Sequence, residues 1–303
     1  MNVASWASTV RSNWETVFPR CREADCGSRK MWRRLYWRRA GIHLENSWYC
    51  GPQCFEHAVC RSLTRAQSAS PSKTQPVRHR IPLGLLMLSR GQLTNRQLRM
   101  ALDAQRTSGT GRIGHWLEQL GFATEQQITA ALGVQWACPV FPISTARDNC
   151  EGLLPLPLLE AFRMLPVQFV PATRLLYVAF CESIEYTALY AIEQMLRCRT
   201  EACLVGDSAM TDALGLLAES RRPADILFDG CRDAAEMARI TCGYALKLGA
   251  SEVRIACCGE FIWARLECSR EPANLLFHRR DTAPQGDTLH LTGCRGSSRP
   301  VAN

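Results

Sequence analysis

Two stretches of the sequence repeat one pattern: LGLLMLSRGQLTNRQLRMALDAQ at residues 83–105 and IGHWLEQLGFATEQQITAALGVQ at residues 113–135. At an offset of 30 residues, apolar, glycine, threonine and glutamine positions coincide, including two glycines with identical spacing. Self-similarity at a fixed period indicates a repeated structural unit. The matched positions are Leu83, Gly84, Gly91, Thr94, Gln97, Leu98, Ala101, Leu102 and Gln105 in the first copy, and Ile113, Gly114, Gly121, Thr124, Gln127, Ile128, Ala131, Leu132 and Gln135 in the second.

Each copy predicts two helices joined by a turn. A short helix begins at the first glycine, and the second glycine, Gly91 or Gly121, ends it because glycine enters the left-handed region without steric cost. Thr94 or Thr124 then caps the next helix, whose apolar residues stand four apart on one face. Two such hairpins predict a four-helix core over residues 80–140, an architecture that by itself names no function.

The pattern LG-x6-G-x6-L-x3-L-x2-Q, written twice, resembles the N-terminal domain of type II secretion and type IV pilus assembly ATPases, known as the MshEN or GspE N-terminal domain. The chain after the second copy is similar to this family as well. The stretches that carry the similarity are QWACPVF at residues 135–141, LPLP at 154–157, FRMLPV at 162–167, LLYVAF at 175–180 and a helix pattern at 186–196. The resemblance covers residues 80–218 and implies that residues 141–218 form the α/β half of the domain.

In this family the two repeats can form a binding surface for cyclic di-GMP. The resemblance assigns that role to Leu83, Gly84, Gly91, Leu98, Leu102 and Gln105 of the first copy and to Arg112, Ile113, Gly114, Gly121, Ile128, Leu132 and Gln135 of the second. These residue types suit the ligand, because arginine pairs with phosphate and glycine permits close approach. The first copy departs from the pattern, since Pro82 stands where the second copy has Arg112, and Arg80 lies two residues away. Other members use the domain only for protein docking, so ligand binding and docking both stay open.

Two close cysteine pairs, Cys21-x4-Cys26 and Cys50-x3-Cys54, lie near the N-terminus with 23 residues between them. Two turns that each supply two thiolates can form a tetrahedral zinc site. Residues 20–60 are therefore expected to bind Zn²⁺. Four cysteines leave no open coordination position, so the site is expected to be structural and to replace a core that so short a segment cannot build.

The chain between and after these pairs predicts a hairpin and a helix. Residues 31–38 and 42–49 predict two strands around an Ala-Gly turn, and residues 50–57 predict a helix start that carries the second pair. This order of knuckle, hairpin and helix resembles treble-clef zinc fingers, with WYCGPQC as the most telling stretch. The resemblance implies a fold and a metal, and it implies no particular function.

The N-terminal quarter carries most of the positive charge. Residues 1–80 contain 14 Lys and Arg and 5 Asp and Glu, while the whole chain has a net charge of +8. Basic residues interleaved with aromatic ones can bind phosphates and stack on bases, although a solvated basic hairpin has the same pattern. Residues 1–19 and 61–79 lack apolar periodicity and are expected to be a flexible N-terminus and a flexible basic linker. The candidate contacts to nucleic acid or an acidic partner are Arg33, Arg34, Arg38 and Arg39.

Residues 222–270 carry a weaker second resemblance. GASEVRI at residues 249–255 is similar to the stretch that opens the ATPase domain of the same motors, with departures at its acidic and histidine positions. No G-x4-G-K-[S/T] occurs in the sequence, and without that phosphate-binding loop no ATP hydrolysis is expected. We therefore expect a degenerate motor segment, or an unrelated small α/β module, followed by a disordered tail over residues 271–303.

The composition limits the class of protein. With 303 residues, of which 47% are hydrophobic, the chain can bury cores in about two domains. No apolar run approaches the roughly 18 residues of a membrane helix, and the N-terminus lacks the apolar stretch of a secretory signal. A cytoplasmic location without membrane insertion is expected. In that compartment most of the 16 cysteines are expected to be thiols that pack in cores.

Together the patterns predict an α+β multidomain protein: a four-cysteine zinc module, a tandem helical-hairpin repeat with an α/β subdomain, and a degenerate C-terminal α/β segment. We expect a non-catalytic adaptor or regulator that works with a secretion or pilus assembly component and can bind cyclic di-GMP. The alternative is a zinc-finger regulator that binds nucleic acid and whose helical domain senses a ligand or docks a protein.

Overall fold

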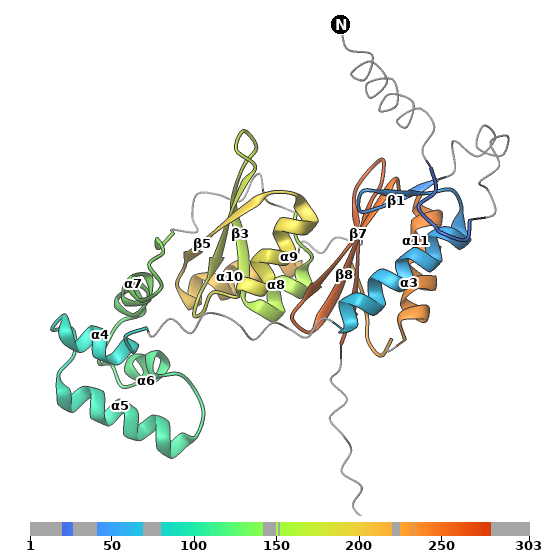
Figure 1. The fold of residues 1–303 in the computed structure, drawn as a ribbon. Coiled ribbons are helices and arrows are strands. Elements are labelled where there is room, and N and C mark those ends of the chain that lie inside the picture. The colour runs from blue at the N-terminus through green and yellow to red at the C-terminus, as the bar shows by residue number, and fades with distance from the viewer. Residues whose placement is uncertain are drawn as a thin grey trace, which may run out of the picture.

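The computed structural model describes residues 20–26, 41–68, 80–141, 150, 152–219, 225–231 and 233–279 of the chain. Figure 1 shows how their helices and strands are arranged. In chain order the elements are β1 (Ile42–Leu44), β2 (Ser47–Tyr49), α3 (Pro52–Ser68), α4 (Leu83–Ser89), α5 (Asn95–Ser108), α6 (Ile113–Gln119), α7 (Glu125–Trp136), α8 (Leu156–Phe162), β3 (Met164–Val170), β4 (Leu175–Phe180), α9 (Tyr186–Leu196), β5 (Arg199–Leu204), α10 (Asp207–Glu219), β6 (Asp225–Phe228), α11 (Ala234–Leu248), β7 (Glu252–Cys258), β8 (Phe261–Glu267) and β9 (Ala273–His278).

Helices α4, α5, α6 and α7 form a small lobe, here called the four-helix lobe, that stands apart from both sheets (Figure 1). Local sequence explains its helix boundaries. Thr94 and Thr124 each form a capping box at the start of α5 and α7, which satisfies backbone groups that a helix start leaves open. Gly91 and Gly121 follow α4 and α6 with φ of +70° and +66°, a conformation that glycine adopts without strain. The buried apolar core of the lobe consists of Leu83, Leu86, Met87, Leu93, Ala101, Leu117, Ala123, Ile128 and Ala131.

The second part of the chain is built on a three-stranded sheet with the order β3-β4-β5. Strands β3 and β4 are antiparallel, and β5 is parallel to β4. One face of this sheet buries Met164, Val178 and Phe180 against α8 and α9. The opposite face buries Leu165 and Cys203 together with residues of α10. Helices on both faces thus leave neither side of the sheet open.

The third part is a six-stranded sheet with the order β2-β1-β7-β8-β9-β6. Strands β7, β8 and β9 form an antiparallel meander, while β6 is parallel to β9 and β1 is parallel to β7. The pairing of β1 with β7 joins the two ends of the chain. His43 N–H donates to the carbonyl of Ser251 at 3.0 Å, and Glu45 N–H donates to the carbonyl of Val253 at 2.8 Å.

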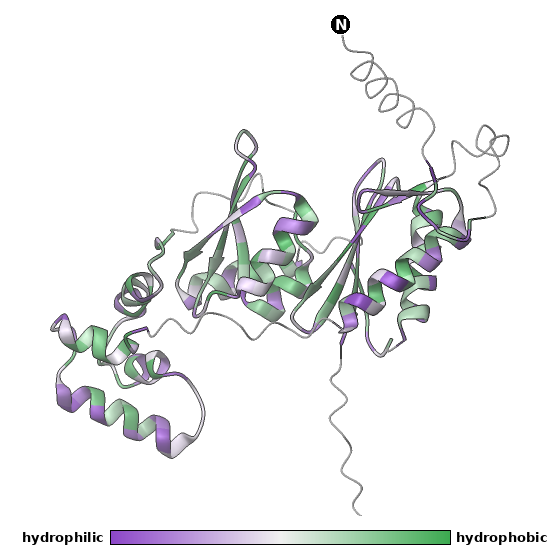
Figure 2. Cartoon of the chain, viewed as in Figure 1, coloured by the Kyte–Doolittle hydropathy of each residue, from purple (hydrophilic) through white to green (hydrophobic). Residues whose placement is uncertain are grey.

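The six-stranded sheet is buried on both faces, which explains why β7 and β8 are almost continuously apolar. Val253 and Ile255 face the core that α3 and α11 cover. The alternate residues Ala256 and Cys258 belong to the core that contains α8 and α9, since successive side chains in a strand point to opposite faces. Helices α8 and α9 therefore lie between the two sheets (Figure 1), and Figure 2 shows that the strands at the centre of both sheets are mostly hydrophobic.

A charged seam fastens α9 to β7. The Arg254 guanidinium donates to the carbonyl of Met195 at 2.6 Å and to the carboxylate of Glu252 at 2.8 Å. Arg197, which follows α9, lies 2.6 Å from the other oxygen of Glu252. Because Arg254 and Glu252 are largely buried, each needs these partners to offset the loss of water.

The structure corrects the expectation of separate N-terminal and C-terminal units. The segments predicted as a zinc module (20–60) and as a degenerate segment (222–270) share one sheet and one hydrophobic core. The physical reason is area: strands of three residues and a single amphipathic helix cannot bury enough apolar surface alone. Phe55, Val59 and Leu63 of α3 are completely buried because α11 and the sheet cover them.

Three predicted boundaries also differ. Helix α3 continues into the segment predicted as a linker (61–79), because Leu63 belongs to the shared core. Strand β9 occupies the start of the segment predicted as a tail (271–303), where a short apolar run pairs with β8. The single strand expected over residues 42–49 is a hairpin instead, with Glu45 at a φ of 56° in its turn.

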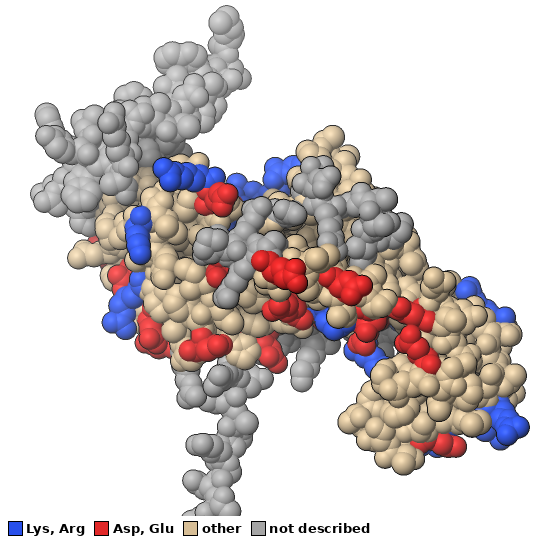
Figure 3. Space-filling view, turned by 180° about the vertical axis from the view of Figure 1, so that it is seen from behind, with Lys and Arg blue, Asp and Glu red and all other residues tan. Residues whose placement is uncertain are grey.

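The surface carries both signs of charge. On the face shown in Figure 3, Asp and Glu side chains gather where the four-helix lobe joins the rest of the molecule, with Lys and Arg among them. In the part of the chain that the structure describes, no helix has both the length and the apolar character needed to cross a membrane.

The shared core makes a prediction for stability. Leu63→Ala is expected to lower the free energy of unfolding by about 2 to 5 kcal/mol, because it leaves a cavity between α3 and α11. Leu246→Ala is the matched control: it removes the same atoms from a side chain of α11 that is 48% exposed, and it should change stability by less than about 0.5 kcal/mol. Denaturant unfolding, combined with hydrogen exchange, measures both. Faster exchange in α3 with unchanged protection of β7 to β9 would contradict a single core.

Candidate functional site

The structure brings the two predicted cysteine pairs together. The sulfur atoms of Cys21, Cys26, Cys50 and Cys54 all lie within 4.8 Å of one another, and the Sγ atoms of Cys26 and Cys50 are 3.4 Å apart. A tetrahedral Zn²⁺ with Zn–S bonds of about 2.3 Å places its sulfur atoms about 3.8 Å apart. Four soft donors at this spacing suit zinc and leave no position for a substrate.

Local structure positions each pair. Cys50 directly follows β2, and Cys54 lies in the first turn of α3, so one strand-to-helix junction supplies two ligands. The loop with the other pair is held by a backbone hydrogen bond from Arg22 N–H to the carbonyl of Trp48 at 3.1 Å. It is also held by Arg61 of α3, whose guanidinium donates to both oxygens of Glu23 at 2.9 Å and 2.6 Å. This hydrogen bonding lowers the pKa of Glu23.

The electrostatics of the cluster fit a bound cation. Burial raises the pKa of the Cys54 thiol, and hydrogen bonding and charge from the other three cysteines raise it further. Four neighbouring thiols therefore stay protonated on their own, since neighbouring thiolates repel each other in a buried place. A divalent cation reverses this balance because it binds the deprotonated sulfur and releases the proton.

The other described cysteines are mostly core residues. Burial raises the pKa of Cys203, Cys242 and Cys258 to about 12 each, so these thiols are inert. Arg33, Arg34, Arg38 and Arg39, and the strand predicted over residues 31–38, lie outside the described residues.

The four-helix lobe holds the predicted dinucleotide residues in two equivalent sets. Gln105, the last matched residue of the first copy, donates to the carbonyl of Gly111 at 2.8 Å. Gln135, its counterpart in the second copy, donates to the carbonyl of Ile81 at 2.7 Å. Ile81 and Gly111 are themselves 30 residues apart. Each copy thus ends on the start of the other, which makes the contact reciprocal, as in an arrangement with two-fold symmetry.

The first glycine of each copy is a point of close packing. A Cβ atom on Gly84 would lie 2.5 Å from Cδ1 of Leu98, and one on Gly114 would lie 3.2 Å from Cγ2 of Ile128 and 3.6 Å from Leu83. The two short helices can approach their partner helices only because these positions carry no side chain. Leu98 and Ile128 are buried, so their contribution to a site is to support it. Leu102, Leu132 and Ile113 are half-buried.

The two arginines near the starts of the copies have different partners. Arg112 immediately precedes α6 and forms an ion pair with Glu182, with 3.1 Å between Nη1 and Oε2. Pro82 occupies the corresponding place before α4. Arg80 stacks on Trp136, with its Cζ atom 3.3 Å from the ring centroid, so its charge is engaged at the end of the second copy.

Sequence reasoning did not identify the acidic partners of the lobe. Glu125, in the first turn of α7, accepts hydrogen bonds from the backbone and hydroxyl of Ser208 at 2.7 Å and 2.6 Å. Glu182 follows β4 and has no motif around it. The repeat offset could not reveal either residue, because each acts across parts of the chain that are about 70 to 80 residues apart.

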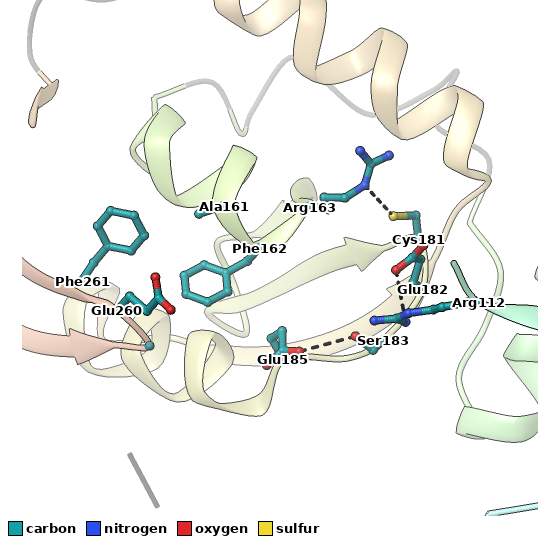
Figure 4. Close-up of a pocket in the computed structure, with 11 residues that line it drawn as sticks. Arg112, Ala161, Phe162, Arg163, Cys181, Glu182, Ser183, Glu185, Glu260 and Phe261 are labelled. Carbon is teal, nitrogen blue, oxygen red and sulfur yellow. Dashed lines mark hydrogen bonds and ion pairs between the residues drawn. The ribbon is translucent and has the colours of Figure 1, made fainter. Parts of the chain in front are cut away.

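A cavity of about 420 Å³ opens beside Arg112, and Figure 4 shows the side chains that line it. The lining comes from three parts of the chain: the start of α6, the end of α8 with the loop after β4, and the turn between β7 and β8. Its charged residues are Arg112, Arg163, Glu182, Glu185 and Glu260.

Comparison with known proteins gives partial matches. No protein-family model and no curated protein sequence matches the chain. Among solved structures, MshE with cdg (cyclic di-GMP) is 26% identical at a TM-score of 0.40, and the match covers 46% of this chain and 99% of that one. The N-terminal domain of XpsE matches in two crystal forms, both 19% identical, at TM-scores of 0.34 and 0.28; the matches cover 44% and 43% of this chain and 91% and 89% of the XpsE chains. Part of this chain resembles the MshEN/GspE N-terminal-type domain.

The reciprocal glutamine contacts lead to a prediction. Gln135→Ala should lower the stability of the four-helix lobe by about 1 kcal/mol, the usual contribution of one hydrogen bond. Gln126→Ala, at an exposed position of the same helix, should change it by less than about 0.5 kcal/mol. Hydrogen exchange of amides in α4 and α7 reports the difference. Equal protection in the two variants would mean that the contact does not hold the copies together.

Proposed function

We propose that this chain is a non-catalytic adaptor or regulator of a secretion or pilus assembly machine, and that its four-helix lobe binds cyclic di-GMP. The observation that carries the proposal is the reciprocal contact of the two copies through Gln105 and Gln135. Cyclic di-GMP has two identical halves, so two equivalent surfaces related in this way match its symmetry. The lobe supplies the expected chemistry at Arg112, a guanidinium that is 60% exposed and can reach a phosphate.

The two surfaces differ at one charge. Arg112 precedes α6 in the second copy, whereas Pro82 precedes α4 in the first. One charged hydrogen bond to a ligand contributes about 1.5 to 3 kcal/mol, so the first copy binds its half of the ligand more weakly. Docking of a protein on the lobe is the alternative use of the same surface, and a ligand-binding measurement separates the two.

The binding test compares Arg112→Ala with Arg106→Ala. Titration calorimetry of the full chain with cyclic di-GMP should show a 10- to 100-fold loss of affinity for Arg112→Ala, which removes one charged contact. Arg106 is an 80% exposed arginine of α5 outside the matched positions, and Arg106→Ala should bind like the unmodified chain.

Absence of heat at high micromolar ligand, from a chain shown to be folded, would reject the ligand and leave docking as the role of the lobe. Equal losses in both arginine variants would place the phosphate contact elsewhere.

We also propose that Cys21, Cys26, Cys50 and Cys54 hold one structural zinc ion. The support is their mutual sulfur distances and a donor set of four thiolates,. When bound, the ion would fasten the N-terminal loop to the junction between β2 and α3. The residues of the chain do the rest: Glu23 and Arg61 orient that loop, and α3 carries the anchored end into the shared core.

The metal test uses one ligand and one neighbour. Cys50→Ser should reduce zinc from about one ion per chain to a small fraction, because three thiolates bind far less tightly than a closed set of four. Cys60→Ser alters a half-buried cysteine of the same helix, outside the cluster, and should retain the metal. Elemental analysis of the purified chains gives both values. Equal zinc content in the two variants would exclude the cluster as its site.

A further inference from the structure

The predicted phosphate-binding arginine already has an anionic partner. The Arg112 guanidinium leaves the four-helix lobe and enters the cavity beside it, where it meets the carboxylate of Glu182 at 3.1 Å (Figure 4). The two side chains are 60% and 46% exposed. An ion pair this open to water is weak and is screened by salt, so it can hold the arginine in one place without locking it there.

The local backbone does not require an arginine at this position. Arg112 has an extended conformation, with φ of −93° and ψ of 159°, and its side chain makes no capping bond to α6. Pro82 takes the equivalent place before α4 with φ of −53° and ψ of 139°. A residue with no charge and no backbone N–H therefore starts the equivalent helix, which means that the guanidinium acts only on groups outside its own helix.

The second arginine of the cavity is held by different groups. Arg163 donates to the Sγ atom of Cys181 at 3.4 Å and to the hydroxyl of Thr211 at 3.1 Å, and it pairs with Asp207. Its partners belong to the elements around the three-stranded sheet. Arg112 is thus the one cavity arginine whose described ion pair links the four-helix lobe to the rest of the molecule.

We infer that Glu182 is an internal competitor that controls ligand binding at Arg112. The inference rests on the proposed binding of cyclic di-GMP by the four-helix lobe. In the free chain the Glu182 carboxylate occupies the guanidinium. A phosphate oxygen of the ligand then replaces this carboxylate as the partner of Arg112, since both are oxyanions that the planar guanidinium accepts.

The exchange changes the cavity. Once Arg112 turns to the ligand, the carboxylates of Glu182, Glu185 and Glu260 remain with Arg163 as the only lining guanidinium. The cavity then becomes more negative at the junction of all three parts of the chain. Occupancy of the lobe is thereby converted into a change of charge that a cationic group of a partner can detect.

The lobe stays attached during this exchange. Glu125 retains its two hydrogen bonds to Ser208. The segment after α7 also pairs with β5, since Phe141 N–H donates to the carbonyl of Leu204 at 2.7 Å and Leu204 N–H donates to the carbonyl of Pro139 at 2.8 Å. None of these contacts involves Arg112, so release of its ion pair changes charge and leaves the connection intact.

The test measures cyclic di-GMP affinity by calorimetry for the full chain and for Glu182→Gln, which keeps the shape of the side chain and removes its charge. The expected result is two- to fivefold tighter binding, the range that an exposed ion pair can supply, with a smaller gain at high salt. Glu118→Gln removes the same charge from an exposed position of α6 and should not change affinity. In an Arg112→Ala background, Glu182→Gln should give no gain.

The outcomes separate the inference from the proposed function. Binding that weakens or stays equal in Glu182→Gln, while Arg112→Ala still loses affinity, would overturn the competitor role and keep the ligand. A gain that persists without Arg112 would also overturn it. Binding by Glu182→Gln alone would support the role strongly. No binding by any variant, all of them folded, would reject the proposed function and the inference with it.

Discussion

The burial of α3 against α11 and one face of the six-stranded sheet holds the two ends of the chain in one domain. Phe55, Val59 and Leu63 have no exposed surface, and full burial of such side chains contributes about 1.5 to 3 kcal/mol each. Because this core brings β1 to the edge of β7, it also sets where the four-cysteine cluster stands. Without it, two three-residue strands would have no sheet to join.

The cysteine cluster and the shared core solve the same problem at two scales. The loop that contains Cys21 and Cys26 is too short to bury a core, so it is held by sulfur geometry and by the Glu23–Arg61 pair. Helix α3, which carries Cys54 in its first turn, continues for several turns into the hydrophobic core. One helix therefore connects a polar, metal-compatible end to an apolar end, and the strength of each depends on the position of the other.

The four-helix lobe follows a different logic, because its contacts are local and repeated. Its caps, glycine turns and reciprocal glutamine bonds all lie within one 30-residue period or its neighbour. Arg112 departs from that logic. It belongs to the repeat by position and to the cavity by contact, which is why one residue can serve the proposed ligand site and the proposed charge change.

Much of the local structure was predictable from the sequence. The helix boundaries at Thr94 and Thr124, the helix start near Cys50 and the gathering of two cysteine pairs follow from short-range patterns, since capping and metal-ligand spacing act over a few residues. The 30-residue offset also indicated which positions of the two copies are equivalent. For these features the sequence alone was sufficient, because the physical causes are contained in neighbouring residues.

Only the tertiary structure decided how the parts combine. The parallel pairing of β1 with β7 joins residues about 200 positions apart, and no local pattern specifies such a partner because any exposed strand edge offers the same backbone groups. The extension of α3 and the strand β9 follow from that shared core. The same holds for Glu182, an ordinary exposed glutamate in the sequence that becomes the partner of Arg112 only when β4 places it there. Charge and hydrogen bonding act through space, so the sequence determined the elements and the fold determined their partners.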